Sequence, residues 1–269
     1  MYTSVPGLDV AYADGVLRLE LARPAKRNAI DDPMMYGLLD AIDAAGRDDA
    51  VRVILLTGAG EDFCAGFDII GRNAPGAPKP RAGSLQRRLP GHAHRLIPLL
   101  AEVQTPVVCA VHGWAAGIGL AIALAADFTI AAADTRFWAP FTERGFTADS
   151  GVSWMLPRRI GEVRARDMLE LGRIVSGTEA AEWCMVHRSV DGDGADLEAA
   201  VGELVGRLAS SATVALGLTK WLQHAGARSP FEAHLRNEAF AMELSSRTED
   251  FRVGMRSLVE KQAPVFTGR

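Results

Sequence analysis

Two features of this chain have the residue types and the spacing for chemistry. The first is the stretch 112–120, in which three glycines fall within seven residues directly before an all-apolar run. Glycine lets the backbone turn sharply, and a helix that begins after such a turn directs N–H groups toward the space before it. Those donors suit a carbonyl oxygen that becomes an oxyanion during a reaction. A simpler interpretation, a tight turn between a strand and a helix, fits the stretch equally well when it is taken alone.

The second feature is Asp149, which lies near three aromatic residues of the segment 141–154. A carboxylate can take a proton from one carbon and return it to another, and apolar neighbours that pack around it raise its pKa toward neutrality. Asp149 also precedes Ser and Gly at 150–151 and an apolar run, which is typical of a helix N-cap. Both interpretations stay open for the residue alone. The nearest other carboxylate, Glu143, is flanked by polar residues and is interpreted as a surface group.

Other kinds of chemistry lack their residue patterns. A phosphate-binding loop would need Lys followed by Ser or Thr after the glycines of 57–68, and none is present. The serines at 150 and 153 lack the Gly-x-Ser-x-Gly elbow of serine hydrolases. The histidines have no further metal ligands at suitable spacing, so we expect no metal. The three cysteines have no Cys-x-x-Cys spacing, and we expect buried thiols in a reducing compartment.

Composition indicates an ordinary globular protein. The chain has 269 residues, 48% of them hydrophobic and 23% charged, which is enough for a substantial core. A net charge of −4 argues against a general nucleic-acid binder. The N-terminus lacks a basic-then-apolar signal, and no apolar run reaches the roughly 18 residues that a membrane span needs. We therefore expect a cytoplasmic protein that binds neither nucleic acid nor a membrane.

The elements that must position these residues can be read from the alternation of apolar runs. Strand-length runs alternate with helical segments in the first two thirds of the chain, which predicts an α/β class. From residue 196 onward the pattern is nearly all helical, so the best boundary separates a core at 1–192 from a helical region at 193–269. Residues 70–90 are rich in Gly, Pro, Lys and Arg, which predicts a mobile surface loop. The expected strands cover residues 15–21, 51–56, 107–111, 128–132 and 186–190.

Taken together, four segments resemble the crotonase (enoyl-CoA hydratase/isomerase) superfamily. Each is weak alone, but their order and spacing favour the assignment, and the resemblance covers almost the whole chain. It implies a spiral of ββα units with a helical C-terminal trimerisation region, assembled as a homotrimer or a dimer of trimers. It also implies an acyl-CoA thioester substrate and no cofactor, since coenzyme A is part of the substrate. The segments are 23–29, 57–68, 113–127 and 264–269.

The resemblance assigns roles to individual residues. The thioester oxygen would bind between the backbone N–H groups of Phe67 and Ile118, the latter standing where the family often has glycine. Lys26, Arg27 and Ala29 fall where family members contact the adenine and phosphates of CoA. Further expected contacts to CoA or the acyl group are Ala65, Gly66, Asp68, Ile69, Ile70, Trp114, Gly117 and Phe141.

Departures from the family pattern bear on the reaction. Two positions that carry water-activating glutamates in the hydratases are Ala121 and Phe141 here, and neither can exchange a proton. Asp149 stands where phenylacetate-pathway epoxide/oxepin-CoA isomerases and dienoyl-CoA isomerases have a proton-transferring aspartate. The resemblance therefore favours an isomerase with Asp149 as proton shuttle. Two alternatives stay open: another crotonase-type reaction, with Asp149 or Glu143 as acid–base or with Asp149 as nucleophile as in chlorobenzoyl-CoA dehalogenases, and a non-catalytic acyl-CoA-binding protein.

Overall fold

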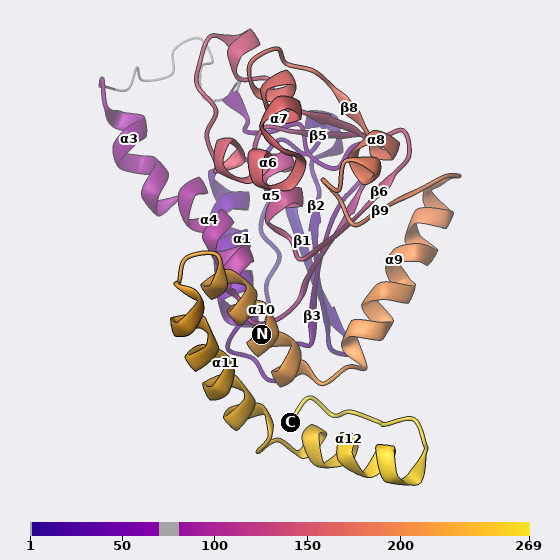
Figure 1. The fold of residues 1–269 in the computed structure, drawn as a ribbon. Coiled ribbons are helices and arrows are strands. Elements are labelled where there is room, and N and C mark those ends of the chain that lie inside the picture. The colour runs from indigo at the N-terminus through magenta and orange to yellow at the C-terminus, as the bar shows by residue number, and fades with distance from the viewer. Residues whose placement is uncertain (1, 70–80) are drawn as a thin grey trace.

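The computed structural model describes residues 2–69 and 81–269, and its central feature is a largely parallel sheet (Figure 1). Within these residues, six strands pair in the order β1-β2-β3-β4-β6-β9. The hairpin of β1 (Leu8–Ala13) and β2 (Val16–Leu21) is antiparallel, and the later pairs are parallel. The remaining strands are β3 (Val53–Gly58), β4 (Val107–Val111), β6 (Phe128–Ala132) and β9 (Arg188–Val190).

A smaller sheet begins inside the glycine-rich stretch. In the described part of the chain it joins β5 (Trp114–Ala116), β7 (Arg136–Trp138) and β8 (Val175–Ser176). Ala115 and Phe137 are opposite each other and fully buried, because this face of the sheet packs on the core. The stretch is therefore a short strand followed by a turn rather than a turn alone.

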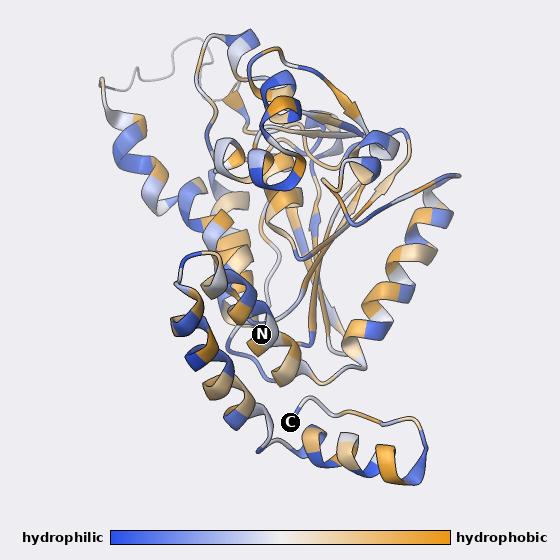
Figure 2. Ribbon diagram, in the orientation of Figure 1, coloured by the Kyte–Doolittle hydropathy of each residue, from blue (hydrophilic) through white to orange (hydrophobic). Residues whose placement is uncertain are grey.

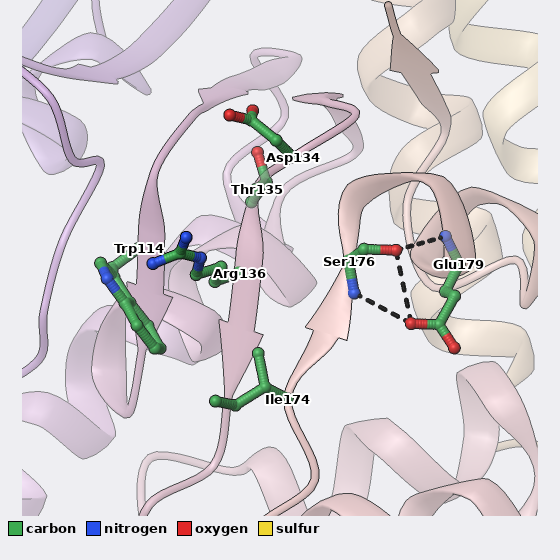
Figure 3. Close-up of a pocket in the computed structure, with 7 residues that line it drawn as sticks. All are labelled: Trp114, Asp134, Thr135, Arg136, Ile174, Ser176 and Glu179. Atoms are coloured by element: carbon green, nitrogen blue, oxygen red, sulfur yellow. Dashed lines mark hydrogen bonds between the residues drawn. The ribbon is translucent and has the colours of Figure 1, made fainter.

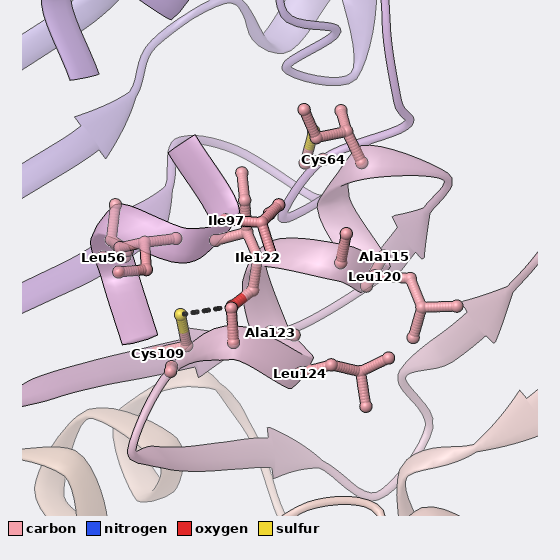
Figure 4. Close-up of a cluster of buried hydrophobic side chains, with 14 of the residues drawn as sticks. Leu56, Cys64, Ile97, Cys109, Ala115, Leu120, Ile122, Ala123 and Leu124 are labelled. Atoms are coloured by element: carbon pink, nitrogen blue, oxygen red, sulfur yellow. Dashed lines mark hydrogen bonds between the residues drawn. The ribbon is translucent and has the colours of Figure 1, made fainter. Parts of the chain in front are cut away.

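Helix α5 (Ile118–Ala125) lies at the centre of the hydrophobic core. All of its residues are buried, as expected for the all-apolar run, and it packs near Leu56 and Ile97 (Figure 4). The apolar residues that Figure 2 shows along the strands and α5 account for this burial. Helices α4 (Ala93–Glu102) and α6 (Val152–Ile160) pack against α5. The core also contains α1 (Asp32–Ala45), α7 (Glu162–Leu169) and α8 (Gly177–Glu182).

Local sequence signals set the ends of α1. The Asp31 side chain accepts a hydrogen bond from Met34 N–H at the N-terminus, and Gly46 follows the last helical residue. The predicted surface loop is wrong for its last part, because α3 (Ser84–Arg88) and a 3₁₀ turn (Leu89–Gly91) occupy it. Good helix formers and two arginines in the last turn of α3 favour a helix there. Residues 70–80 of that prediction lie outside the described residues.

The C-terminal region is helical, as predicted, and its first helix belongs to the packing of the sheet. Leu197, Val201 and Leu208 of α9 (Gly194–Ala209) pack in one buried cluster with Val108 and Ile130 of the sheet. Then follow α10 (Thr213–Gly226), α11 (Phe231–Ser245) and α12 (Glu249–Glu260). Among the described helices, none by itself has the length and apolar character to cross a membrane; α9 and α10 meet that test only together, across a bend of 103°.

A buried ion pair attaches α10 to the core. Lys220 Nζ is 2.7 Å from Asp127 Oδ2, and it also donates hydrogen bonds to the main-chain oxygens of Leu100 (2.9 Å) and Thr105 (3.4 Å). The same Asp127 oxygen accepts from Val107 N–H (2.7 Å). One side chain of the helical region thus joins the end of α4 to the first residues of β4 and β6.

Candidate active site

The glycine-rich stretch places an N–H group without an intrahelical partner at the start of α5. Gly117, with φ of 55°, is the N-cap residue, and Ile118 is the first helical residue. The first four N–H groups of a helix have no carbonyl within the helix to bind. Among residues 2–69 and 81–269, no acceptor is found for the Ile118 N–H.

A second turn, residues 64–68, lies directly against the first. Cys64 N–H donates to the Trp114 oxygen (2.8 Å), and the Cys64 oxygen accepts from Ala116 N–H (2.9 Å), so the two segments pair like parallel strands. Glycine is required where the backbones meet, because a Cβ at Gly119 would lie 2.5 Å from the Cys64 oxygen. The structure therefore brings together two turns that are about 50 residues apart in the sequence.

Phe67 lies in the second turn, and a parallel bridge to Ile30 sets its orientation. Ile30 N–H donates to the Gly66 oxygen (2.8 Å), and the N–H after Phe67 donates to the Ile30 oxygen (2.9 Å). In this bridge Ile30 uses both its N–H and its carbonyl, whereas Phe67 uses neither, so the Phe67 N–H points away from Ile30. A Cβ on Gly117 would lie only 3.8 Å from the Gly66 Cα. The amides predicted to form the oxyanion hole, those of Phe67 and Ile118, thus each follow one of two neighbouring glycines.

The predicted CoA contacts Lys26, Arg27 and Ala29 lie on a loop beside the second turn. The Arg27 main-chain oxygen accepts a hydrogen bond from Ala65 N–H (2.9 Å), which fixes the loop to that turn. Lys26 and Arg27 expose their side chains, and Arg27 Nε is 3.7 Å from Asp62 Oδ2. The two cations are therefore available to an anionic ligand that approaches this turn from solvent.

Three residues that hold this loop had no predicted role. The Arg23 guanidinium donates to the Asp68 carboxylate (3.0 Å). Asn28 is fully buried, and its amide donates to two main-chain oxygens of the neighbouring segment (2.8 and 2.6 Å). The Asp62 carboxylate accepts from Trp114 N–H (2.9 Å) and so ties that segment to β5. Of these residues, Asn28 carries a signal in the sequence. Asn tolerates the left-handed backbone conformation that Asn28 adopts here, with φ of 55°, so an Asn within a loop indicates such a turn.

Asp149 lies half-buried in the turn that precedes α6. Ser150 Oγ donates a hydrogen bond to Asp149 Oδ1 (3.0 Å). Burial raises the pKa of the Asp149 carboxyl above its ordinary value, while the Ser150 hydroxyl and the charge of His94 partly oppose that rise in pKa. A carboxyl with a raised pKa is better matched to proton transfer near neutral pH.

The competing interpretation of Asp149, a helix cap, is wrong. The N-cap residue of α6 is Gly151, and the helix has no side-chain cap. Between them, Ser150 has φ of 52°, a left-handed conformation that costs a residue other than glycine about 1 kcal/mol or more. Such backbone strain concentrates at functional sites.

Helix α4 packs against the Asp149 turn. A Cβ at Gly151 would lie 3.7 Å from Ile97 Cγ2. His94 stands one helical turn before Ile97, on the same face of α4, and its charge acts on Asp149. The exposed His94 imidazole thus acts on the Asp149 carboxylate through its charge, an effect that had not been predicted from the sequence.

Ala121 and Phe141, the two positions where the resemblance implies glutamates in the hydratases, are both buried. Ala121 is fully buried in α5, and Phe141 is 2% exposed, with its ring edge-on to Phe146 at 5.7 Å between centroids. Glu143 is exposed on the 3₁₀ turn Thr142–Arg144 and lies against Gly172, as expected for a surface group.

The remaining predicted contacts lie in different places. Ile69 is 44% exposed beside the second turn, whereas Ile70 lies outside the described residues. The Trp114 ring faces the Arg136 guanidinium at 5.3 Å, in a pocket of about 350 Å³ on the small sheet (Figure 3). Asp149 is not among the residues that line this pocket. The lining residues are Trp114, Asp134, Thr135, Arg136, Ile174, Ser176 and Glu179.

Two further kinds of group can be assessed in the described part of the chain. No three side chains of His, Cys, Asp or Glu in it are arranged to hold a metal ion. Cys64 is buried in the second turn, and burial raises the pKa of its thiol to about 12. Because the thiolate is the reactive form, Cys64 is a packing residue and not a nucleophile.

The chain is similar to known enzymes over nearly its whole length. A 1,2-epoxyphenylacetyl-CoA isomerase from Escherichia coli (strain K12) is 36% identical over 95% of this chain and 96% of its own. A 4-chlorobenzoyl coenzyme A dehalogenase from an Arthrobacter species is 32% identical over 86% of this chain and 82% of its own. The crystal structure of an enoyl-CoA hydratase from Bacillus anthracis matches with a TM-score of 0.89 and 28% identity, covering 98% of this chain and 100% of the other.

These similarities confirm the fold class expected from the sequence, a mixed α/β core of the crotonase type with C-terminal helices. The sequence pattern of the enoyl-CoA hydratase/isomerase family matches residues 11–269. The chain therefore belongs to the enoyl-CoA hydratase/isomerase family.

Proposed function

We propose that this protein is an acyl-CoA isomerase that moves a double bond, or a proton, through a thioester enolate. The observation that carries the proposal is the half-buried Asp149 with its raised pKa. Ala121 and Phe141, where the family resemblance implies the two carboxylates of a hydratase, cannot exchange a proton. One carboxylate is enough for isomerisation, because the proton that it removes is returned to another carbon of the same substrate. Adding water needs groups that hold and activate the water, and these two positions do not supply them.

The geometry supports a defined sequence of steps. The thioester oxygen accepts hydrogen bonds from the Phe67 and Ile118 N–H groups, which stabilise the enolate by about 3–4 kcal/mol for each donor. Asp149 removes a proton next to the conjugated system and delivers it to a different carbon. The double bond shifts as the proton moves, so the product is an isomer of the substrate. Lys26 and Arg27 bind the CoA phosphates from the neighbouring loop.

Solvent deuterium exchange tests this reaction. Wild-type protein is incubated in D₂O with a panel of enoyl-CoA and aryl-acetyl-CoA esters, and deuterium is located by NMR. We expect exchange at the carbons that flank the migrating bond, and a loss of about 10²–10⁴-fold in Asp149→Asn. Asp134→Asn, in the pocket on the small sheet, is the matched control and keeps the wild-type rate.

Three results would contradict the proposal. Exchange that persists in Asp149→Asn would exclude Asp149 as the proton shuttle. Tight binding of CoA esters without exchange for any of them would favour the acyl-CoA-binding alternative, and net addition of water would favour a hydratase.

His94 supports a second candidate function in which Asp149 is a nucleophile. The relative from Arthrobacter is a dehalogenase, and such a reaction needs a base beside the carboxylate. In this reaction an Asp149 oxygen attacks the carbon that bears chloride, chloride leaves, and an aryl ester forms. Water, deprotonated by His94, then attacks the ester carbonyl and releases the hydroxylated product.

A single-turnover experiment in H₂¹⁸O separates the two functions. With 4-chlorobenzoyl-CoA as the probe, the nucleophilic route puts ¹⁸O into the Asp149 carboxylate and a carboxylate ¹⁶O into the product, together with one chloride per turnover. The isomerase route labels neither Asp149 nor the product with ¹⁸O. Mass spectrometry of the peptide that contains Asp149 gives the result.

The exposed apolar side chains of the last helices support a homotrimer or a dimer of trimers. Large apolar residues on α11 and α12 are well exposed in the single chain, and exposed apolar patches mark association surfaces. We expect Leu258→Glu with Val259→Glu to shift the mass measured by light scattering toward the monomer. A location in the cytoplasm stays a prediction. The exposed residues are Phe231, Leu235, Phe240, Met242, Leu244, Met255, Leu258 and Val259.

A further inference from the structure

We propose that His92 is a positioning residue of the oxyanion hole: its imidazole supports the Phe67 ring and thereby holds the direction of the Phe67 N–H. The proposal rests on the function proposed above, because it takes the Phe67 N–H as a donor to the thioester oxygen. His92 lies immediately before α4, on a different segment from either glycine turn.

The contact between the two rings is close and nearly parallel. The centroids of His92 and Phe67 are 5.6 Å apart, and the ring planes differ by 19°. His92 is 6% exposed, so its imidazole is a fixed part of the interior. Flat rings packed in this way restrict each other's rotation, and a restricted Phe67 side chain restricts the backbone that bears it.

Helix α1 in turn holds the imidazole. His92 Nε2 is 3.1 Å from Asp32 Oδ1, and the Tyr36 ring meets the imidazole edge-on at 5.4 Å and 74°. Asp32 and Tyr36 are four residues apart and therefore share one face of α1. The Arg88 guanidinium also lies 3.2 Å from the Asp32 carboxylate. The contact with the Asp32 carboxylate and the edge of the Tyr36 ring together orient the imidazole against Phe67.

The bridge to Ile30 fixes the main-chain groups on either side of Phe67, and the contact with His92 fixes the Phe67 ring. Without the ring contact, a small rotation about the bridge would tilt the Phe67 N–H. An oxyanion donor acts only when it lies roughly 2.7–3.1 Å from the oxygen. A small tilt therefore weakens carbonyl activation while leaving the CoA contacts of the loop intact.

Substitutions of His92 separate ring packing from a general structural role. His92→Leu fills the space without a flat ring, whereas His92→Phe restores the ring without the contact to Asp32. The matched control is His187→Ala, which removes another His–Phe ring pair, with Phe128 edge-on at 5.2 Å on the far strand β6. Circular dichroism and the unfolding temperature confirm that each variant is folded.

The readout is the infrared carbonyl stretch of a ¹³C-labelled enoyl-CoA thioester bound in the Asp149→Asn background, where turnover does not interfere. A hydrogen-bonded carbonyl absorbs at lower frequency than a free one. We expect the lowering to be lost in His92→Leu and kept in His92→Phe and His187→Ala. With Asp149 present, His92→Leu lowers kcat by about 10-fold with KM little changed, and His92→Phe restores kcat.

Failure of this proposal is distinguishable from failure of the proposed function. A wild-type carbonyl shift in His92→Leu, or no rescue by His92→Phe, overturns the role of His92. A lowered frequency in the Asp149→Asn protein, combined with no deuterium exchange by the wild-type protein, rejects the isomerase, while the comparison of His92 variants still decides the positioning role. If the carbonyl frequency is not lowered in the Asp149→Asn protein, the oxyanion hole and the role of His92 are both overturned.

Discussion

Replacing Lys220 with Met tests how the helical region is attached to the sheet. The Lys220 side chain is 7% exposed, and its ammonium has Asp127 as counter-ion and two main-chain oxygens as acceptors. Removing it leaves a carboxylate buried without its cation, which costs about 3–5 kcal/mol. In a protein of this size roughly 2 °C of unfolding temperature corresponds to 1 kcal/mol, so we expect a fall of about 6–10 °C.

The double variant Asp127→Asn with Lys220→Met makes this prediction sharper. Burial raises the pKa of Asp127 and lowers the pKa of Lys220, so desolvation outweighs attraction in both groups. The intact pair therefore contributes little net stability, and removing both charges should restore at least half of the loss. The Asn oxygen still accepts from the Val107 N–H.

Differential scanning calorimetry at pH 7 and at one protein concentration measures these changes, because association of copies also shifts the unfolding temperature. A loss below about 1 kcal/mol in Lys220→Met would refute the reasoning from burial. So would a double variant that is as unstable as the single one.

Four further predictions concern the site. Burial raises the folded-state pKa of Asp149 above its unfolded value. The stability that this carboxyl contributes is therefore present below the unfolded pKa and is lost as pH rises through the folded pKa. Asp149→Asn should unfold at a higher temperature than wild type at pH 8, and equal unfolding temperatures there would contradict this reasoning. The acid limb of the kcat/KM profile should rise with pH through that raised pKa, because the ionised Asp149 carboxylate is the base that takes the proton. Lys26→Glu with Arg27→Glu should raise KM for acyl-CoA more than it lowers kcat, and an unchanged KM would remove these residues from the CoA site. Gly119→Ala should lower the free energy of unfolding by about 1–3 kcal/mol and lower kcat, because its Cβ would meet the facing turn. Gly202→Ala in α9 has open space around its Cβ and should be neutral or stabilising. Urea titrations measure both changes in stability.

Elements with local signals could be predicted from the sequence. The Asp31 cap and Gly46 mark the ends of α1, and the apolar run of β6 matches the strand Phe128–Ala132. Elements that depend on distant partners could not. The strand β5 forms because it pairs with β7, and β1 pairs with β2 although its own pattern is mostly exposed.

The site divides in the same way. Asp149 could be singled out because its aromatic neighbours in the sequence suggest burial, and the pairing of the Phe67 and Ile118 turns followed only from the family resemblance. His92 and His94 could not be placed, because their roles depend on how α4 packs against Phe67 and against the turn before α6. Side-chain packing between elements carries no signature in a single sequence.

The pairing of Cys64 with the residues around Ala115 has a consequence for how this scaffold can change. The N–H groups that we propose to polarise the carbonyl belong to the main chain of two paired segments, so replacing a side chain nearby would not delete a donor. Positions such as Ala121 and Phe141 can therefore be exchanged to admit another acyl group or to install another proton carrier. In this arrangement, activation of the carbonyl would depend on the main chain and survive such substitutions, whereas the reaction that follows would depend on individual side chains.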